Sequence, residues 1–405
     1  MILDRATLLL RLEASLDGAR WRALQQVVQA ARPGRAYLNG GAVRDLLLGV
    51  EPDASDLDVT IVGRDARDVV RQLGGRFTTH DAFLTGTWHL DGFSVDLVTA
   101  RRETYERPGA LPTVTAGTLE HDLARRDFTI NAMVIDLQRG ELIDRHGGQA
   151  DLEAGRLRVL HERSWEDDPT RLFRAARYAA RFGFELVSPL PPLDADDRVD
   201  PVFRVSSAGS PRLAAELDRV FCEARPVAAL ELLEGWGVLG AAFPSHNRDL
   251  AWAARLGADR DALWCWWCRG DALAVAAFSR LGVGLPRGIA RLPDVEVLQQ
   301  QGLPDDPVGR GRVLGDLPLV VLRTLRGALP DDPGLDWWED QGRHIETAVD
   351  GELLIARGHA PGPAFRRALR AAREAAWAGQ DPSGQLLAAE RAIVGDGDTP
   401  GGSQL

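Results

Sequence analysis

The chain has 405 residues, 45% of them hydrophobic and 26% charged, a composition ordinary for a globular protein of about two to four domains. Its formal net charge of −11 argues against a protein that coats nucleic acid indiscriminately, although a local basic track is compatible with it. The sequence contains no lysine, so all 48 basic residues are arginines, and every contact with a phosphate or a base must use a planar guanidinium, which suits bidentate binding.

The composition also indicates a compartment. No stretch approaches the roughly 18 apolar residues that a membrane helix requires, and acidic residues in the N-terminal run MILDRATLLLRLEASLDGARW favour an amphipathic helix over a signal peptide. Three cysteines are too few for a disulfide framework, so we expect a cytoplasmic protein without a membrane partner. Cys265 and Cys268 form a C-x-x-C with no second Cys or His pair nearby, and we expect buried core thiols there rather than zinc ligands.

Helical and strand patterns alternate along the first 140 residues. We expect a helix over 5–31, a strand over 36–39, a glycine turn with a short helix, a strand in DLDVTIV, a helix near 65–73, and short strands in RFTTH, GTWHLDG and FSVDLVTA. From Ser164 onward strand patterns nearly vanish, and loops are expected at 187–210, 303–309 and 329–335. The expected fold class is therefore α+β, with a mixed-sheet head followed by an all-helical remainder.

The run LNGGAVRDLLLG is followed by an acidic pair in SDLDVTIVG. Gly40 and Gly41 let backbone amides approach a phosphate closely because no Cβ stands in the way, and the start of the next helix adds a positive dipole end. Asp56 and Asp58 are two apart on an expected strand, so both carboxylates face one point, where they can hold two Mg²⁺ ions. A phosphate cradle beside two metal ligands indicates nucleotidyl transfer, and the pair of motifs resembles that of the DNA polymerase β superfamily.

Two further patterns add polar residues. Asp96 interrupts the apolar run of FSVDLVTAR, and it is either a strand-edge residue or a third carboxylate near the metal ions. If RRDFTINAM is helical, Asp127 and Asn131 lie on one face with Arg126 beside them. Such an Asp and Asn can hydrogen-bond ribose hydroxyls, while an Arg neutralises triphosphate charge.

The stretch EDDPTRLFRAARYAARFGF predicts one helix with a proline in its first turn. At about 100° per residue, Asp168 and Arg171 stand about 60° apart. Arg174, Arg177 and Arg181 form a basic stripe on a neighbouring sector. A carboxylate beside a guanidinium can read the Watson–Crick edge of a nucleobase, although an Asp–Arg pair at this spacing is ordinarily only a surface salt bridge.

These motifs, in this order, make the chain resemble the bacterial class II tRNA nucleotidyltransferases, the family of CCA-adding enzymes and bacterial poly(A) polymerases. The resemblance is strong over residues 36–184, weaker over 212–244, and returns over 349–374. It implies a polymerase β-like catalytic head with an all-helical neck, body and tail. The expected limits are 1–140 for the head, 141–244 for the neck with its base-selecting helix, 245–348 for the body, 349–390 for a tRNA-binding tail and 391–405 for a disordered end.

The resemblance also implies roles for single residues. The metal ions are expected on Asp56 and Asp58, with Asp96 as a further candidate catalytic carboxylate. The nucleotide, ATP or CTP, is expected to meet Gly40, Gly41, Arg44 and Asp45 at its triphosphate and Asp127 and Asn131 at its ribose. Asp168 and Arg171 resemble the protein template that selects the base. The arginines expected to face phosphates or the nucleotide are Arg125, Arg126, Arg174 and Arg177.

The implied reaction is Mg²⁺-dependent attachment of nucleotides to the 3′ end of tRNA, with the terminal hydroxyl as nucleophile and pyrophosphate as leaving group. In this family A addition depends on a flexible loop between the first two motifs, and residues 101–114 are long enough to supply one, which favours CCA or A-only addition over CC-only addition. The alternatives are a poly(A) polymerase, disfavoured because no long basic C-terminal arm is present, and an inactive RNA-binding relative, disfavoured by the intact acidic pair. The sequence assigns no oligomeric state.

The chain departs from the family pattern in three places. Asp167 stands where the template motif usually carries Glu, and Pro211 precedes Arg212 where the next helix usually carries a Glu-Arg pair. Arg212 and Glu216 are therefore the candidate supports of the template. The segment SHNRDLAWAARLG lacks a His-Asp doublet, so we expect no metal-dependent phosphohydrolase activity.

Overall fold

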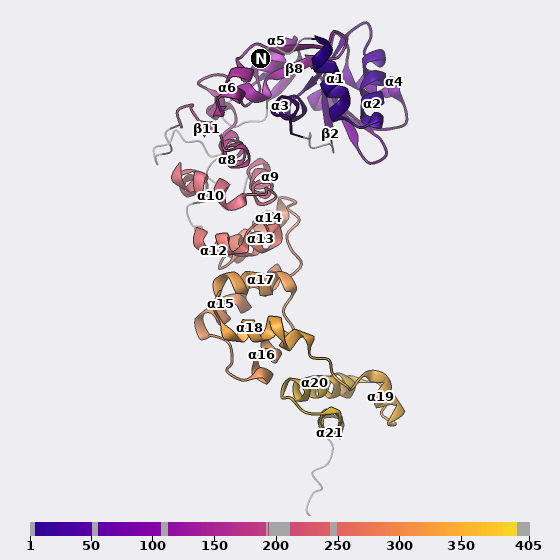
Figure 1. The fold of residues 1–405 in the computed structure, drawn as a ribbon, viewed down its shortest axis with the longest axis vertical. Coiled ribbons are helices and arrows are strands. Elements are labelled where there is room, and N and C mark those ends of the chain that lie inside the picture. Colours follow the sequence, from indigo (N-terminus) through magenta and orange to yellow (C-terminus); the bar gives the residue numbers. More distant parts are fainter. Residues whose placement is uncertain are drawn as a thin grey trace, which may run out of the picture. The chain divides into compact units, whose positions relative to one another are not determined.

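The computed structural model describes residues 5–50, 56–106, 112–191, 193, 211–243 and 249–394 (Figure 1). The chain divides into two compact units, residues 1–246 and 247–405. This division lies next to the expected limit between neck and body, while the finer limits at 140/141 and 348/349 stay predictions. No helix in the described ranges is both long and apolar enough to cross a membrane.

The first unit contains a seven-stranded mixed sheet in the order β3-β4-β5-β2-β1-β8-β9. Its strands are β1 (Arg35–Asn39), β2 (Asp56–Val62), β3 (Arg76–His80), β4 (Thr85–His89), β5 (Ser94–Thr99), β8 (Met133–Asp136) and β9 (Glu141–Asp144). β2 and β5 run parallel, and the other neighbours are antiparallel. Two smaller sheets pair β6 (Arg101–Thr104) with β7 (Thr113–Ala116), and β10 (Arg156–Leu157) with β11 (Glu185–Leu186).

Eleven helices of the first unit are described. They are α1 (Arg5–Ser15), α2 (Gly18–Ala30), α3 (Gly41–Leu48), α4 (Ala66–Leu73), α5 (Leu119–Ala124), α6 (Gly148–Glu153), α7 (Ser164–Asp167), α8 (Arg171–Phe182), α9 (Pro211–Phe221), α10 (Pro226–Gly235) and α11 (Val238–Ala242). Two short 3₁₀ turns, η1 (Asp81–Phe83) and η2 (Thr129–Asn131), complete the unit.

Alternation along β2 and β5 separates an apolar face from a polar one. Leu57 and Val59 on β2 and Leu97 on β5 are fully or almost fully buried. Their neighbours on the opposite face include acidic residues, because successive side chains of a strand point to opposite sides. α4 packs closely on this sheet at Gly86 of β4, where a Cβ would lie 2.7 Å from Val70 Cγ1. α4 therefore covers the apolar face of the sheet, and the acidic side chains of β2 and β5 project from the opposite face.

The expected helix over 5–31 is two helices. α1 ends at Ser15, and α2 starts at Gly18 with Asp17 as its N-cap. The Asp17 side chain accepts a hydrogen bond from the backbone N–H of Arg20 at 2.8 Å. An Asp that caps a new helix in this way ends the preceding one, because its own backbone leaves the helical conformation.

Over residues 249–394, the regular elements of the second unit are all helices (Figure 1). They are α12 (Leu250–Leu256), α13 (Arg260–Cys268), α14 (Ala272–Arg280), η3 (Ile289–Arg291), α15 (Leu292–Gln301), α16 (Pro307–Leu314), α17 (Leu319–Ala328), α18 (Pro333–Asp340), η4 (Gly342–His344), α19 (Gly351–Ala356), α20 (Pro363–Trp377) and α21 (Pro382–Val394). The expected disordered end at 391–405 is helical up to 394, and the rest of it lies outside the described residues. So does most of the expected loop at 187–210.

Cys265 and Cys268 lie in the core of the second unit. Both are free thiols on α13 and almost completely buried, beside Trp264, Trp266 and Trp267 of the same helix. Burial raises the pKa of each thiol to about 12. A thiol that stays protonated is a poor metal ligand, so the expected core role agrees with these surroundings.

Candidate active site

The glycine turn after β1 lies beside the carboxylate of Asp58. Gly40 has φ +70° and ψ −139°, a conformation that residues with a Cβ rarely adopt. A Cβ built on Gly40 would lie 3.4 Å from Asp58 Oδ2. The structure thus brings the predicted phosphate cradle and the predicted metal ligand together.

Asp96 lies next to Asp58 on the neighbouring strand. In the parallel pair of β2 and β5, Asp58 is in register with Asp96, so both side chains project from the same face. Thr87 Oγ1 on β4 donates to Asp96 Oδ1 at 2.6 Å and orients this carboxylate. Asp56 is the first residue of β2, in register with Ser94, and its side chain lies outside the described part. This register places Asp96 beside Asp58, and its role as a third carboxylate near metal ions stays a prediction.

This acidic face fits a divalent cation that is held largely by water and substrate. Within the described residues, which leave out the Asp56 side chain, no three His, Cys, Asp or Glu side chains form a metal-binding group. Mg²⁺ prefers oxygen ligands, keeps several waters, and is commonly bound through one or two carboxylates plus substrate phosphates. Asp58 is exposed, and Gly40 beside it carries no side chain that could cover the carboxylate.

Arg44, which we expected at the triphosphate, is buried and directed into the protein. Its Nε donates to Asp45 Oδ1 at 2.8 Å and its Nη1 to Asn131 Oδ1 at 2.9 Å. The guanidinium carbon also lies 4.8 Å from the ring centre of Phe182 and 5.2 Å from that of Tyr178. Arg44 therefore joins α3 to η2 and α8 in this structure, and its contact with a phosphate stays a prediction.

Asp127 and Asn131 meet, although the segment is not the helix under which the sequence analysis placed them on one face. α5 ends at Ala124, and Phe128 adopts an extended conformation before the 3₁₀ turn η2. Phe128 is fully buried and forms a β-bridge with Val159, which draws the chain away from a helical path. Asn131 Nδ2 nevertheless donates to Asp127 Oδ1 at 3.0 Å, because the turn folds one residue back over the other.

A buried ion pair joins Asp127 to α8. Nε and Nη2 of Arg174 lie 2.7 and 2.6 Å from Asp127 Oδ2. Burial by itself would raise the pKa of Asp127. The charges of Arg174 and Arg171 and the hydrogen bonds from Asn131 and Arg174 together outweigh it, and the pKa is lowered to about 2. Asp127 is therefore a carboxylate at neutral pH, able to accept a hydrogen bond from a hydroxyl group.

A buried carboxylate that the sequence analysis missed holds Arg125 and Arg126. Arg125 Nη2 donates to Asp122 Oδ1 at 2.8 Å, and Arg126 Nη2 donates to Asp122 Oδ2 at 3.0 Å. Burial opposes ionisation of Asp122, but the charges of Arg125 and Arg126 outweigh it, so its pKa lies below the usual range. Spacings of three and four residues in DLARR are the signal that identifies this cluster.

The expected helix over EDDPTRLFRAARYAARFGF is interrupted at Asp168, which has φ −146° and ψ 92° between α7 and α8. Pro169 explains the break, since a proline disfavours the helical conformation of the residue before it. Asp168 Oδ1 accepts hydrogen bonds from Thr170 Oγ1 at 2.6 Å and from the Thr170 backbone N–H at 3.1 Å. Its Oδ2 is ion-paired with Arg212 of α9, one of the two expected supports.

Arg171 is buried and does not pair with Asp168. Its Nη1 donates to Ser164, and its Nη2 donates to the backbone carbonyl oxygen of Arg125 at 2.7 Å. Among the described contacts there is no ion pair between Arg171 and Asp168, so the ordinary reading of a surface salt bridge is excluded. Each side chain is instead held by separate partners.

One pocket gathers half of the twelve residues predicted to meet the nucleotide, and Gly40, Gly41, Arg44, Asp45, Asn131 and Arg177 do not line it. It has a volume of about 300 Å³. Its lining includes the predicted residues Arg125, Arg126, Asp127, Asp168, Arg171 and Arg174. It also includes Phe83, Arg101, Glu103, Tyr105, Pro112 and Arg212.

Four of the additional lining residues, Arg101, Glu103, Tyr105 and Pro112, come from the segment expected to be a flexible loop. Arg101, Glu103 and Tyr105 alternate along and just beyond β6, whereas Arg102 and Thr104 between them are exposed. β6 pairs with β7 from Arg101 opposite Ala116 to Thr104 opposite Thr113, and residues 107–111 lie outside the described part. The alternating pattern R-x-E-x-Y is the sequence signal that reveals this strand.

Comparison with known proteins now assigns the chain to a family. Residues 36–158 match the family model of the poly(A) polymerase head domain. A CC-adding tRNA nucleotidyltransferase of Deinococcus radiodurans is 35% identical over 342 residues, which cover 82% of each chain. The chain belongs to the tRNA nucleotidyltransferase family.

The chain is also similar to two further proteins of known kind. An A-adding tRNA nucleotidyltransferase of Halalkalibacterium halodurans is 38% identical over 223 residues, 52% of each chain. A structure of the Thermotoga maritima CCA-adding enzyme with tRNA has a TM-score of 0.72 at 22% identity and covers 97% of this chain and 100% of its own. The expected α+β fold, with a sheet-containing head and a helical remainder, is confirmed.

In this nucleotidyltransferase the far part of the expected basic stripe is neutralised. Arg177 lies 3.0 Å from Glu216 Oε2 and 2.9 Å from Glu223 Oε1, and Arg181 Nη2 lies 2.6 Å from Glu223 Oε1. Neither arginine lines the pocket of about 300 Å³. A role for Arg177 in facing the nucleotide stays a prediction, since its described contacts hold α8 against α9 and Glu223.

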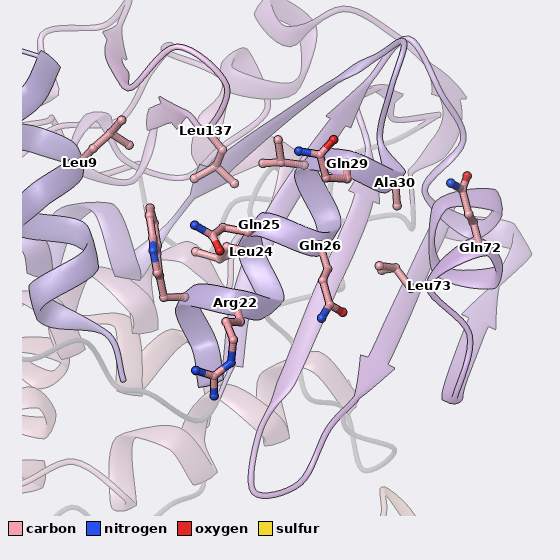
Figure 2. A pocket seen from close by; sticks show the side chains of 12 residues that line it. Leu9, Arg22, Leu24, Gln25, Gln26, Gln29, Ala30, Gln72, Leu73 and Leu137 are labelled. Atoms are coloured by element: carbon pink, nitrogen blue, oxygen red, sulfur yellow. The ribbon is translucent and has the colours of Figure 1, made fainter. Parts of the chain in front are cut away.

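A larger pocket of the nucleotidyltransferase, about 830 Å³, lies along α2 and is a different feature (Figure 2). Gln25 and Gln29 of α2, Leu9 of α1 and Leu137 contribute to its lining. None of the residues predicted to bind metal or nucleotide lines it. Its size therefore does not make it the nucleotide site.

Proposed function

We propose that this family member transfers nucleotides from ATP or CTP to the 3′ end of tRNA, releases pyrophosphate, and uses no nucleic-acid template. The observation that carries the proposal is the pocket that gathers Asp127, Asp168 and Arg171. It combines an ionised carboxylate for a ribose with a carboxylate and a guanidinium for a base. The names of the relatives, which add C or A to tRNA, support the same substrates. A tRNA substrate also implies a cytoplasmic location.

Asp56, Asp58 and Asp96 are the residues that would hold two Mg²⁺ ions on the acidic face of β2 and β5. When bound, the ions supply positive charge at the reacting phosphate and favour the ionised form of the tRNA 3′ hydroxyl. The chain itself supplies the orientation of these carboxylates: Thr87 fixes Asp96, and the strand register fixes Asp96 beside Asp58. No side-chain nucleophile is required, because phosphoryl transfer depends mainly on positioning and charge stabilisation.

The base-selecting role rests on hydrogen-bonding chemistry. Cytosine and adenine both present an exocyclic amine next to a ring nitrogen that accepts a hydrogen bond, whereas uracil and guanine present a carbonyl oxygen next to a ring N–H. The carboxylate of Asp168 can accept from the amine, and the guanidinium of Arg171 can donate to the ring nitrogen. Both side chains line one pocket, and each is positioned by other residues and not by an ion pair with the other. They are therefore oriented before a base binds.

The products compatible with this site are CCA, a terminal A, or CC. The sequence favours CCA or A-only addition. CC addition is the second candidate, because the Deinococcus radiodurans relative, which aligns over 82% of each chain, is a CC-adding enzyme. We assign no preference for poly(A) synthesis, since the observations above do not favour it.

The proposal is tested by incubating the purified protein with Mg²⁺, labelled CTP or ATP, and tRNA that lacks part of its 3′ end. We expect incorporation that stops on chelation of the metal. Asp58→Ala should lower transfer at least about 1000-fold, because a metal ligand is lost, while tRNA binding is preserved. Asp91→Ala, an exposed aspartate in the turn before β5, is the matched control and should transfer normally. Appreciable transfer by Asp58→Ala would remove the metal assignment.

A further inference from the structure

The guanidinium of Arg125 is held between two buried carboxylates. Nε and Nη2 lie 3.0 and 2.8 Å from Asp122 Oδ1, and Nη1 lies 3.2 Å from Glu103 Oε1. The Asp122 side chain is 0% exposed and the Glu103 side chain 6%. Every nitrogen of the guanidinium thus has a carboxylate partner. Such a neutralised arginine is poorly suited to the triphosphate contact that the sequence predicts for it.

Glu103 is the member of this cluster that comes from a different part of the chain. It lies on β6, whereas Arg125 follows α5. Besides Arg125, it binds Arg101 Nη2 at 2.8 Å and accepts a hydrogen bond from the Tyr105 hydroxyl at 2.9 Å. Glu103 therefore connects β6 to the start of the RRD motif.

The backbone of Arg125 makes the next connection. Its carbonyl oxygen accepts the hydrogen bond from Arg171 Nη2 at 2.7 Å, and Ser164 accepts from Arg171 Nη1. These two contacts fix the plane of the Arg171 guanidinium, which is planar and rigid. The position of Arg125 thereby determines where Arg171 directs its remaining donors in the pocket.

We infer that Glu103 is a specificity-determining positioning residue, which holds Arg125 so that the Arg125 carbonyl orients Arg171 toward the base. The inference rests on the proposed function of Arg171 as part of the base-selecting pair. It reassigns Arg125 from a phosphate ligand to a support of base recognition. Glu103 itself is not a catalytic residue, because it acts through Arg125.

The test compares Glu103→Gln with the wild type in the full-length protein. Glutamine keeps the size of the side chain but removes the charge that holds Arg125 and Arg101. Two quantities are measured: the ratio of kcat/KM for the preferred nucleotide to that for each of the other three, and equilibrium binding of the four nucleoside triphosphates. We expect discrimination to fall roughly tenfold, the usual scale for loss of one hydrogen bond to a charged group. Binding of inorganic tripolyphosphate should be unchanged.

Glu106→Gln is the matched control, because Glu106 is an exposed glutamate three residues further along the same segment. It should keep the wild-type discrimination. Arg125→Lys is a second variant, which keeps the positive charge but cannot bridge Asp122 and Glu103. It should lose discrimination in the same way and bind tripolyphosphate as the wild type does.

Three results separate the possibilities. Unchanged discrimination in Glu103→Gln, even with a lower melting temperature, would reduce Glu103 to a structural residue and overturn the inference. Weaker tripolyphosphate binding by Arg125→Lys with unchanged discrimination would overturn it in favour of a phosphate contact. Absence of transfer by the wild type would reject the proposed function instead, and the nucleotide-binding ratios would still decide the role of Glu103.

Discussion

Asp127 is kept ionised by Arg174, Asn131 and Arg171 together, although burial favours its neutral form. Its pKa is about 2 in the folded protein and 3.8 as a free side chain, so folding favours the ionised form. Because the pKa is lowered on folding, the resulting stability is present above the unfolded value and is lost as pH falls through the folded value. The shift corresponds to about 2 kcal/mol at neutral pH.

Asp127→Asn should therefore lower the free energy of unfolding by about 2 kcal/mol at neutral pH, and leave Arg174 without its carboxylate. The difference from the wild type should stay constant from about pH 8 to about pH 5 and shrink as pH falls from about 4 toward 2. Urea unfolding at a series of pH values measures it. A difference that changes mainly between pH 5 and 7 would show that another group is responsible.

At the scale of elements, the turn between β1 and α3 requires a glycine at position 40. Gly40→Ala would force a side chain into a backbone conformation reserved for glycine and place its methyl group 3.4 Å from Asp58 Oδ2. We expect transfer to fall at least about tenfold, beyond the loss of about 1 to 3 kcal/mol of stability that the strain causes.

Gly49→Ala is the control for this prediction. Gly49 ends α3 with φ +69°, and a Cβ there would meet nothing within 4 Å. It should cost about 1 kcal/mol of stability and leave transfer unchanged. Equal losses of activity in the two variants, measured below their melting temperatures, would show that closeness to Asp58 has no effect.

Local pattern predicts the elements of the head well, and long-range contacts explain where it fails. The alternation of FSVDLVTA and the glycine turn are local signals, and they predict β5, α3 and the meeting of Gly40 with Asp58. The helix considered for the segment around Asp127 does not form, because Phe128 pairs with Val159, a partner that local pattern cannot identify. The extended backbone at Asp168 could be predicted from the sequence, because a proline follows it. Its ion pair with Arg212 could not, because Arg212 lies more than forty residues away in the chain.

At the scale of the whole molecule, the sequence predicts functional residues in the first unit but none in the second. The first unit contains the acidic face, the pocket and the ion pairs that hold them. Sequence motifs identify residues of each of these features. The second unit carries helices with buried tryptophans and thiols, and its pattern indicates a core but no chemistry. With a net charge of −11, the proposed recognition of tRNA would depend on local arginines, because the overall field of the protein repels a polyanion.

The most direct test of the central claim compares three tRNA substrates that end at the discriminator base, at C, and at CC. The wild-type protein, Mg²⁺, CTP and ATP are incubated with each, and the 3′ ends of the products are sequenced. We predict that extension stops at a defined end after at most three nucleotides, all of them C or A, and that unrelated RNA is not extended. Long runs of A on unrelated RNA, or incorporation of U or G at comparable rates, would contradict the account.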